Sequence, residues 1–370
     1  MKTVCERNQC AGCMACIEIC PKEAIRIEDS LRTYNAVIDE ANCINCGACR
    51  QICQENHFPC QIKPIYWKQG WAQDSKIRKH SSSGGAAAAI ETAFARGGGI
   101  VCSCVFLDGE FKFLFAKTVE EIEVFKGSKY VKSNPKGIYK KILQYLKEGR
   151  KVLFVGLPCQ AAAVRNYVGT NDNLYTIDLI CHGTPSPQIL EIYLSEHQCT
   201  LDQIRNISFR EKTQYGLRKD EKTITAPFIR DNYTMAFLRS ISCTDNCYTC
   251  KYAILERVTD ITLGDSWGSN LPEIEQRRGI SLILCQTEKG LELLQQSNLY
   301  LLDVNLECAV AHNHQLRHPS VMPSKRDMFF YGIEKGIKFD KIFSKCYPGR
   351  YIKNTLKMIL YKLKLYGGGN

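Results

Sequence analysis

Apolar runs of strand length and helical runs alternate through most of the chain. Residues 86–95 are rich in alanine and predict a helix, and residues 100–107 form an apolar run that follows a triple-glycine turn. The same order returns later, with apolar runs at 152–155 and 174–180 and a helical run at 161–167 between them. This alternation predicts a body of α/β or α+β type.

The first sixty residues follow a different pattern. Residues 24–28 and 35–39 alternate between apolar and polar side chains, as short strands do, and each of these segments lies next to a run of cysteines. Two such halves predict a compact two-part module. Residues 64–78 then predict a linker, or an extended arm over the next domain.

The 21 cysteines among 370 residues are the unusual feature of the composition. The two N-terminal runs repeat the spacing CxxCxxCxxxC about thirty residues apart. In two-cluster ferredoxins the first three thiolates of such a run hold one cluster and the fourth thiolate holds the other. A disulfide framework and paired zinc sites are alternatives, but two CxxC pairs suffice for a zinc ribbon, which leaves this double register unexplained. The spacing therefore predicts two [4Fe-4S] clusters, one held by Cys10, Cys13, Cys16 and Cys53, and the other by Cys43, Cys46, Cys49 and Cys20.

We therefore expect an α+β protein in which an N-terminal two-cluster ferredoxin-like module is fused to a larger domain of α/β type. The expected divisions are residues 1–62 for the module, 63–78 for the linker, 79–150 and 151–315 for two parts of the larger domain, and 316–370 for a basic tail with an amphipathic helix.

Hydropathy predicts a cytoplasmic protein with reduced thiols, because no window approaches the apolar length of a membrane span and the first residues lack a signal-peptide core. Residues 317–370 carry a net charge of +9. Lysines 353, 357, 362 and 364 lie between apolar residues of helical spacing, which are Ile352, Leu356, Ile359, Leu360 and Leu363. Such a helix docks on its own domain, or else lies on an anionic membrane at its inner face or on an acidic partner. Nucleic acid is not an expected partner, because no binding motif accompanies the basic residues.

Two further features of the body point to bound groups. The loop Ser82-Ser83-Gly84-Gly85 opens the predicted helix at 86–95, and free N–H groups at a helix N-terminus favour a phosphate, although such loops are also common structural caps. Cysteines also stand at two strand or helix ends and in a CxxC pair. A third metal centre, a zinc site and unconnected buried cysteines all remain open for these four residues, which are Cys159, Cys181, Cys247 and Cys250.

Six ordered motifs between residues 78 and 315 together resemble the beta subunit family of coenzyme F420 hydrogenase and dehydrogenase. They are Ser82-Ser83-Gly84-Gly85, Gly127-Ser128-Lys129-Tyr130-Val131, Gly156-Leu157-Pro158-Cys159-Gln160, Cys181-His182-Gly183, Cys247-Tyr248-Thr249-Cys250-Lys251 and Gly264-Asp265-Ser266-Trp267-Gly268.

The resemblance implies FAD and a [4Fe-4S] cluster in this domain. It makes Cys159, Cys181, Cys247 and Cys250 the ligands of that third cluster and leaves Cys243 as a spare thiol or a substitute ligand. It also makes Ser82, Ser83, Gly84 and Gly85, together with the Gly127–Tyr130 turn, candidates for FAD contacts, with Lys129 as the balancing cation and Tyr130 beside it. The substrate stays open, because relatives act on the deazaflavin F420 or belong to chlorophyll-type reductases or to proteins linked to surface polysaccharides.

These expectations describe an iron-sulfur flavoprotein oxidoreductase, which exchanges electrons with a ferredoxin or another redox partner and a hydride with a small organic substrate or deazaflavin. His182 is a candidate proton donor, or else a hydrogen-bonded residue next to a ligand. Asp265 and Trp267 are candidates for shaping the flavin or substrate pocket, or else they form a tight turn with an aromatic lid over it. One alternative function is an electron-transfer subunit of a larger hydrogenase or dehydrogenase complex with no substrate of its own. Another is a structural or sensing iron-sulfur protein without flavin.

Overall fold

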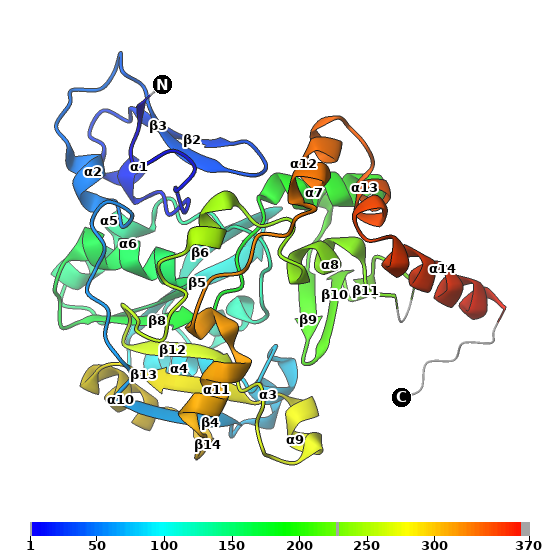
Figure 1. Ribbon diagram of the computed structural model, residues 1–370. Helices are drawn as coiled ribbons and strands as arrows, with labels where there is room; N and C mark the ends of the chain where they lie inside the picture. Colours follow the sequence, from blue (N-terminus) through cyan, green and yellow to red (C-terminus); the bar gives the residue numbers. More distant parts are fainter. Residues whose placement is uncertain (1, 227–228, 364–370) are drawn as a thin grey trace.

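The computed structural model describes residues 2–226 and 229–363 (Figure 1). A small cysteine-rich module lies at the N-terminal end, above a central sheet that has helices on both faces. A lobe of helices with a second small sheet lies at the side of the central sheet. The expected α+β class, with a ferredoxin-like module fused to a larger α/β-type domain, is confirmed.

The central sheet has eight strands. In spatial order they are β14 (Leu299–Leu302), β4 (Tyr66–Ala72), β13 (Ser281–Cys285), β12 (Ile261–Asp265), β8 (Leu174–Leu179), β7 (Val152–Gly156), β5 (Ile100–Leu107) and β6 (Glu110–Ala116). The four strands from β12 to β5 are parallel, with Val152 of β7 opposite Leu174 of β8, and the outer strands pair antiparallel. Parallel strands need both faces covered, which agrees with their continuous apolar runs.

Successive residues of these strands point into two different cores. On β7, Leu153 and Val155 face a core that includes helix α4 (Ala86–Arg96), whereas Phe154 faces the opposite core under helix α6 (Pro158–Val168). The remaining helices of the body are α3 (Ser75–His80), α5 (Ile138–Lys147), α9 (Glu273–Arg278), α10 (Glu288–Gln295) and α11 (Leu306–His312), with 3₁₀ turns η1 (Glu120–Phe125) and η4 (His314–Leu316). The strands and helices expected at 86–95, 100–107 and 174–180 are confirmed to within one residue.

The N-terminal module has a three-stranded antiparallel sheet of order β1-β3-β2 and two short helices. Its elements are β1 (Lys2–Thr3), α1 (Ala15–Ile19), β2 (Ile25–Asp29), β3 (Tyr34–Ile38) and α2 (Ala48–Ile52). The buried carboxylate of Glu18 accepts hydrogen bonds from backbone N–H groups at the start of α5, including that of Lys140 at 3.1 Å. A carboxylate at a helix N-terminus is favoured by the free N–H groups and by the helix dipole, so this contact ties the module to the body.

The segment predicted as a linker differs from that expectation, because residues 63–78 contain β4. This strand pairs on both sides, with Gln69 opposite Leu282 of β13 and Leu302 of β14. The side chain of Gln69 is fully buried and donates a hydrogen bond to the backbone oxygen of Asp303 at 2.9 Å. Polar residues that are satisfied inside a sheet hide a strand from a hydropathy pattern, which explains the difference.

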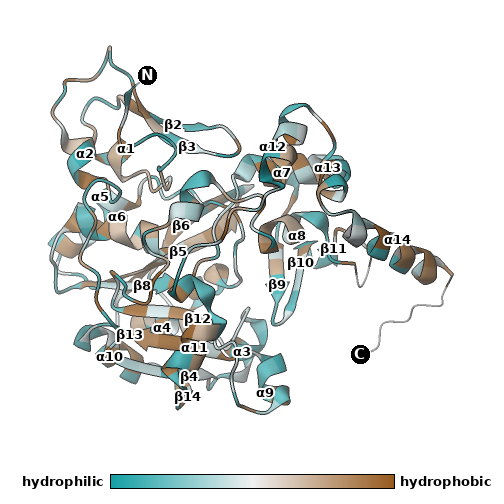
Figure 2. Ribbon diagram, in the orientation of Figure 1, coloured by the Kyte–Doolittle hydropathy of each residue, from teal (hydrophilic) through white to brown (hydrophobic). Residues whose placement is uncertain are grey.

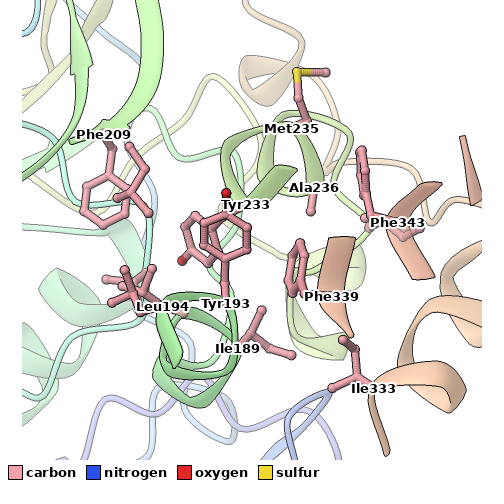
Figure 3. Close-up of a cluster of buried hydrophobic side chains, with 14 of the residues drawn as sticks. Ile189, Tyr193, Leu194, Phe209, Tyr233, Met235, Ala236, Ile333, Phe339 and Phe343 are labelled. Carbon is pink, nitrogen blue, oxygen red and sulfur yellow. The ribbon is translucent and has the colours of Figure 1, made fainter. Parts of the chain in front are cut away.

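The lobe has a core of its own, in which aromatic side chains pack among aliphatic ones (Figure 3). Tyr193, Tyr233 and Phe339 come from three different helices and pack together there. The elements of the lobe are α7 (Pro187–Glu196), α8 (Asn232–Leu238), α12 (Arg326–Glu334), α13 (Phe339–Cys346), the small sheet of β9 (Ile207–Glu211), β10 (Gln214–Lys219) and β11 (Lys222–Thr223), and the turns η2 (Leu201–Gln203) and η3 (Asp245–Thr249). Much of the predicted tail is therefore part of this core, since α12 and α13 supply buried phenylalanines to it.

The last described helix, α14 (Pro348–Lys362), extends away from the lobe and shows both brown and teal residues in Figure 2. Ile352, Leu356 and Ile359 on its apolar stripe are 58%, 55% and 49% exposed. Lys364, which the sequence also placed in this helix, lies outside the described residues. Within the described part of the chain, no helix combines the length and the apolar character needed to cross a membrane.

Candidate functional site

The first predicted cysteine set comes together in the N-terminal module. Its four thiols, those of Cys10, Cys13, Cys16 and Cys53, are buried and line one small cavity. The loop that begins at Cys10 folds back toward the sulfur of that residue. The backbone nitrogen of Gly12 lies 3.4 Å from the Sγ of Cys10. A fifth cysteine, Cys5, lines the same cavity and hydrogen-bonds to Cys10 and Cys53, which lowers the pKa of the Cys53 thiol to about 7.

The second set lines a separate small cavity at the outer end of the module and comprises Cys20, Cys43, Cys46 and Cys49. The backbone N–H of Asn45 lies 3.4 Å from the Sγ of Cys43, which repeats the geometry at Cys10. The surroundings differ from those of the first set, because Cys46 is exposed and the neighbouring Ile44 is 56% exposed. One sequence spacing thus gives a buried inner site and a solvent-facing outer site.

The third set is assembled from distant parts of the body. Cys159 lies in the first turn of α6, Cys181 follows β8, and Cys247 and Cys250 belong to the η3 turn region. Cys159 and Cys250 pack in one small cluster with Tyr252, and the backbone N–H of Thr184 lies 3.4 Å from the Sγ of Cys247.

Cys243 also lies beside this third set. A Cβ added to Gly183 would stand 2.8 Å from its sulfur. The six other body cysteines lie outside the set: Cys102 and Cys104 on β5, Cys285 on β13, Cys308 on α11, and Cys199 and Cys346 in the lobe core.

The four cysteines of the third set are each half-buried. Burial raises the pKa of Cys181 to about 12 and that of Cys250 to about 11, and the neighbouring Cys247 adds to both shifts. Coordination to a metal removes the proton from such a thiol, so binding of a metal centre here would release protons. Among the described residues, no group of three or more His, Cys, Asp or Glu side chains is placed around a single metal ion. A cubane has a different requirement, because each thiolate binds its own iron atom.

A cavity of about 750 Å³ adjoins the third set. It opens where β7, β8 and β12 end, and its wall includes Gly156, the stretch from Cys181 to Thr184, and Asp265. Ligands of α/β sheets bind beyond the carboxyl ends of parallel strands, and this volume lies within the range of cofactor sites.

The two loops predicted to contact a cofactor meet at this cavity. Ser82, Ser83 and Gly85 line it at the N-terminus of α4, and the Oγ of Ser82 accepts a hydrogen bond from the N–H of Ser128 at 2.9 Å. Gly85 has a φ of +88°, which a glycine adopts without strain. Gly84 does not line the cavity. It lies against the sheet, where an added Cβ would stand 2.5 Å from the backbone oxygen of Gly70.

Lys129 and Tyr130, from the second loop, also line the cavity. The ammonium of Lys129 donates hydrogen bonds to the backbone oxygens of Phe125 at 2.7 Å and Lys126 at 3.2 Å, and burial lowers its pKa. Glu91 of α4 is buried in the same wall, and burial raises its pKa to about 7 against the opposing effect of Lys129. The ring of Tyr130 stacks on Phe237 with the centres 4.3 Å apart.

Comparison with known proteins identifies two parts of the chain. Residues 149–301 match the family that is described as the C terminus of the coenzyme F420 hydrogenase/dehydrogenase beta subunit. Residues 9–56 match the 4Fe-4S dicluster domain. The chain carries both domains.

The resemblance read from the motifs is therefore confirmed at the level of these two families.

A search among curated proteins found no match. Among solved structures, a chain from the xenon-derivatised F420-reducing [NiFe] hydrogenase complex of Methanosarcina barkeri is 18% identical, with a TM-score of 0.49, and the similarity covers 74% of this chain and 94% of that chain.

Within the beta-subunit domain, His182 is held on both sides. Its Nε2 lies 2.9 Å from the Oγ of Ser240, and its Nδ1 lies 2.9 Å from the side-chain nitrogen of Gln315. Since an amide nitrogen only donates, Nδ1 accepts and Nε2 carries the proton. Burial, together with His314, lowers the pKa of His182 to about 4. This arrangement favours the hydrogen-bonded alternative for His182 over the proton donor.

The outer wall of the cavity combines a partly buried ion pair with aromatic rings. Arg210 donates to both carboxylate oxygens of Asp265, at 2.6 and 2.7 Å, and its guanidinium lies over the rings of Tyr215 and Trp267. Asp265 and Trp267, which the motif singled out, thus line the cavity and share Arg210 as a partner. Planar charged and aromatic groups of this kind suit a planar organic ligand.

Several cavity and cluster-site residues carry no sequence signal. Lys212 of the β9–β10 turn donates to the backbone oxygens of Ser81 at 2.7 Å and Ser83 at 2.8 Å, and so fixes the serine loop from a point 129 residues away. Burial, with Arg78 and Arg210 nearby, lowers its pKa to about 8. Glu91 lies in helix α4, and nothing in the sequence distinguishes it from a glutamate on the surface of a helix. Cys5 lies outside the CxxC spacing, and a sequence pattern therefore identifies none of these residues.

Proposed function

We propose that the protein is an iron-sulfur flavoprotein oxidoreductase that exchanges electrons between three [4Fe-4S] centres, FAD and an organic substrate. The observation that carries this proposal is the serial arrangement of three cysteine sets and one cavity. Iron-sulfur clusters exchange single electrons, and a flavin joins two such transfers into one hydride transfer.

The series begins at the solvent-facing outer set and continues through the buried inner set. The inner set contacts the body through Tyr252, whose hydroxyl donates to Gln54, a residue that lines the inner cavity. Tyr252 also packs with Cys159 and Cys250 of the third set. Finally, Cys181 belongs to the third set and lines the large cavity. Cysteines of the outer and the inner set also pack in one hydrophobic cluster of the module. Each neighbouring pair of sites is therefore in contact, as short-range electron exchange requires.

The residues that would hold FAD fit that cofactor chemically. The N-terminus of the eleven-residue helix α4 and the hydroxyls of Ser82 and Ser83 offer donors for a diphosphate. Lys129 supplies a half-buried positive charge, and Tyr130 supplies an aromatic face. The remaining wall around Trp267 and Tyr215 would take the substrate, for which we propose the deazaflavin F420 or a biosynthetic intermediate, including one of surface polysaccharide synthesis.

The outer end of the series is the proposed docking point of a ferredoxin or another redox partner. Cys46 and Ile44 are exposed there, whereas the inner set is enclosed between the module and the body. Hydrophobic side chains exposed next to a redox centre allow a partner to approach it closely.

Iron and flavin analysis of anaerobically purified protein tests the function directly. We expect about twelve irons and one FAD per chain, because three cubanes hold four irons each. Eight irons without flavin would reduce the protein to a dicluster domain attached to a body of other chemistry. Reduction of the bound flavin by a reduced ferredoxin, followed by optical spectroscopy, then tests whether the sites exchange electrons.

We further propose that α14 contacts an anionic membrane surface. Its apolar stripe is exposed, and from residue 348 to 362 the helix contains four basic and no acidic residues. An exposed amphipathic helix of this composition suits anionic lipid headgroups. Cosedimentation with phosphatidylserine-containing vesicles tests this, using Leu356→Asp on the stripe and Thr355→Asp beside it as a charge-matched control. We expect only Leu356→Asp to abolish binding, and equal loss in both variants or no binding by the wild type would contradict the proposal.

A further inference from the structure

A buried lysine lies between the dicluster domain and the third cysteine set. Lys132 is 5% exposed, and its Nζ donates a hydrogen bond to the backbone oxygen of Ala11 at 3.1 Å. The ammonium also lies 5.1 Å from the ring centre of Tyr34. On its other side, the backbone N–H of Lys132 donates to Pro185 at 2.9 Å, in the loop that begins at Cys181.

Lys132 has no carboxylate partner within ion-pair distance in residues 2–226 and 229–363. Two arginines differ in this respect, since the buried Arg326 has Asp245 at 2.7 Å and the half-buried Arg210 has Asp265. Burial of an ammonium without an opposite charge is expensive, and one carbonyl with one aromatic face offsets only part of that cost. The position therefore calls for a nearby negative charge.

The loops that Lys132 contacts belong to two different cysteine sets. Its ammonium donates to Ala11, which lies between Cys10 and Cys13 of the inner set. Its backbone N–H donates to Pro185, which follows Cys181 of the third set and pairs with Cys243 in an isolated bridge. One lysine thus contacts the ligand loops of the inner set and of the third set at once.

We propose that Lys132 is the shared counter-charge of the inner and the third cysteine sets, and that it raises the reduction potential of the clusters bound there. The inference rests on the proposed function, because it requires a cluster at the third set. Four thiolates give a bound cluster a net negative charge, which grows when one electron is added. A fixed positive charge close to the cluster stabilises that reduced form, and net charge and hydrogen bonds are established determinants of cluster potential. Lys132 is a positioning and tuning residue, since it touches the ligand loops and not a substrate.

Redox titration of the full-length, anaerobically prepared protein, followed by electron paramagnetic resonance, tests this proposal. We compare the wild type with Lys132→Met, which keeps the stem without the charge, and with Lys132→Arg, which keeps the charge. The matched control is Lys136→Met, on an exposed lysine four residues later. In Lys132→Met we expect at least a tenfold fall in the reduction equilibrium constant of two clusters, or about 59 mV for one electron. The outer cluster should keep its potential, as should all clusters in Lys132→Arg and Lys136→Met.

Unchanged potentials in a fully loaded Lys132→Met protein would overturn the inference. If Lys132→Met does not assemble, Lys132→Gln replaces it, because glutamine retains a donor for Ala11. Failure of the proposed function gives a distinct result, namely a wild type with eight irons. In that case the effect of Lys132 on the inner cluster alone is still measured, and its absence counts against the shared role.

Discussion

The dicluster domain and the beta-subunit domain bring cysteines together by opposite routes. In the dicluster domain, eight cysteines lie within residues 10–53, and short loops place them around two cavities. In the beta-subunit domain, the four predicted ligands lie between residues 159 and 250 and come from a helix start, a strand end and a 3₁₀ turn. The first arrangement depends on local spacing and the second on the register of a sheet.

This difference has a consequence for stability. Since β7 and β8 pair in parallel register, the segments that follow them, with Cys159 and Cys181, leave the sheet at the same edge. Formation of the third set therefore requires the folded body, whereas each ligand loop of the dicluster domain forms from its own neighbours. A cluster bound at the third set, as proposed, would stabilise the long-range contacts that frame the cavity.

The largest effects are expected from the dicluster domain. Under the proposed function, Cys13→Ala and Cys46→Ala should each remove about four of twelve irons and leave the flavin bound, because the cavity lies in the body and not in the dicluster domain. Cys13→Ala should also lower the melting temperature more, since Cys13 packs in a core with Tyr139 whereas Cys46 is exposed. Iron analysis, flavin fluorescence and thermal unfolding measure these outcomes. Flavin loss in both variants would show that the two regions are not independent.

The next effect concerns the third set, where the ligands come from distant segments. Cys159→Ser should remove about four irons, leave about eight and weaken flavin binding, because Cys181 and its loop form part of the cavity wall. The matched control is Cys308→Ser, at a cysteine outside all three sets. Cys243→Ser should likewise retain twelve irons. If the Cys159→Ser protein kept its full iron content and reduced flavin normally, the third cysteine set would not be a site of electron transfer.

A smaller effect concerns Glu91 in the cavity wall. A carboxyl group whose pKa rises from 4.5 to about 7 on folding binds a proton more tightly in the folded state, so stability falls as pH rises between these values. Glu91→Gln removes this dependence, which amounts to roughly 3 kcal/mol at most by linkage. Melting temperatures of both proteins at pH 5 and pH 7.5 measure the difference. Equal pH dependence in the two proteins would mean that Glu91 has an ordinary pKa.

The smallest effect tests the contact between the two regions. Tyr252→Phe removes the hydroxyl that binds Gln54 but keeps the ring, which lies 4.9 Å from that of Phe58. We expect a loss of about 1 kcal/mol in unfolding free energy, with all irons retained. Tyr300→Phe, at a tyrosine that is 55% exposed, serves as the control. A loss of iron in Tyr252→Phe would instead assign this tyrosine to the cluster sites themselves.

Much of the fold follows from the sequence because its signals are local. The alanine-rich run gives α4, the apolar runs give β5 and β8, and the alternating segments give β2 and β3. Strand β4 was not predicted because Gln69 interrupts its apolar pattern. In the folded protein this side chain is buried, and a hydrogen bond to Asp303 satisfies its polar group. The helices α12 and α13 looked like a basic tail because their lysines are exposed, while their phenylalanines fill the lobe core.

The candidate site divides in the same way. Local sequence was enough to predict which cysteines of the N-terminal module lie together, the helix start at α4 and the two domain families, since each depends on residues close together in the chain. The folded structure was needed to show that Cys5 and Cys243 join two of the sets, that Lys212 fixes the serine loop, and that Lys132 lies between two groups of thiols. The physical reason is that a short spacing fixes local geometry, whereas burial, counter-charge and cavity shape arise from groups that meet only when the sheet and lobe have formed.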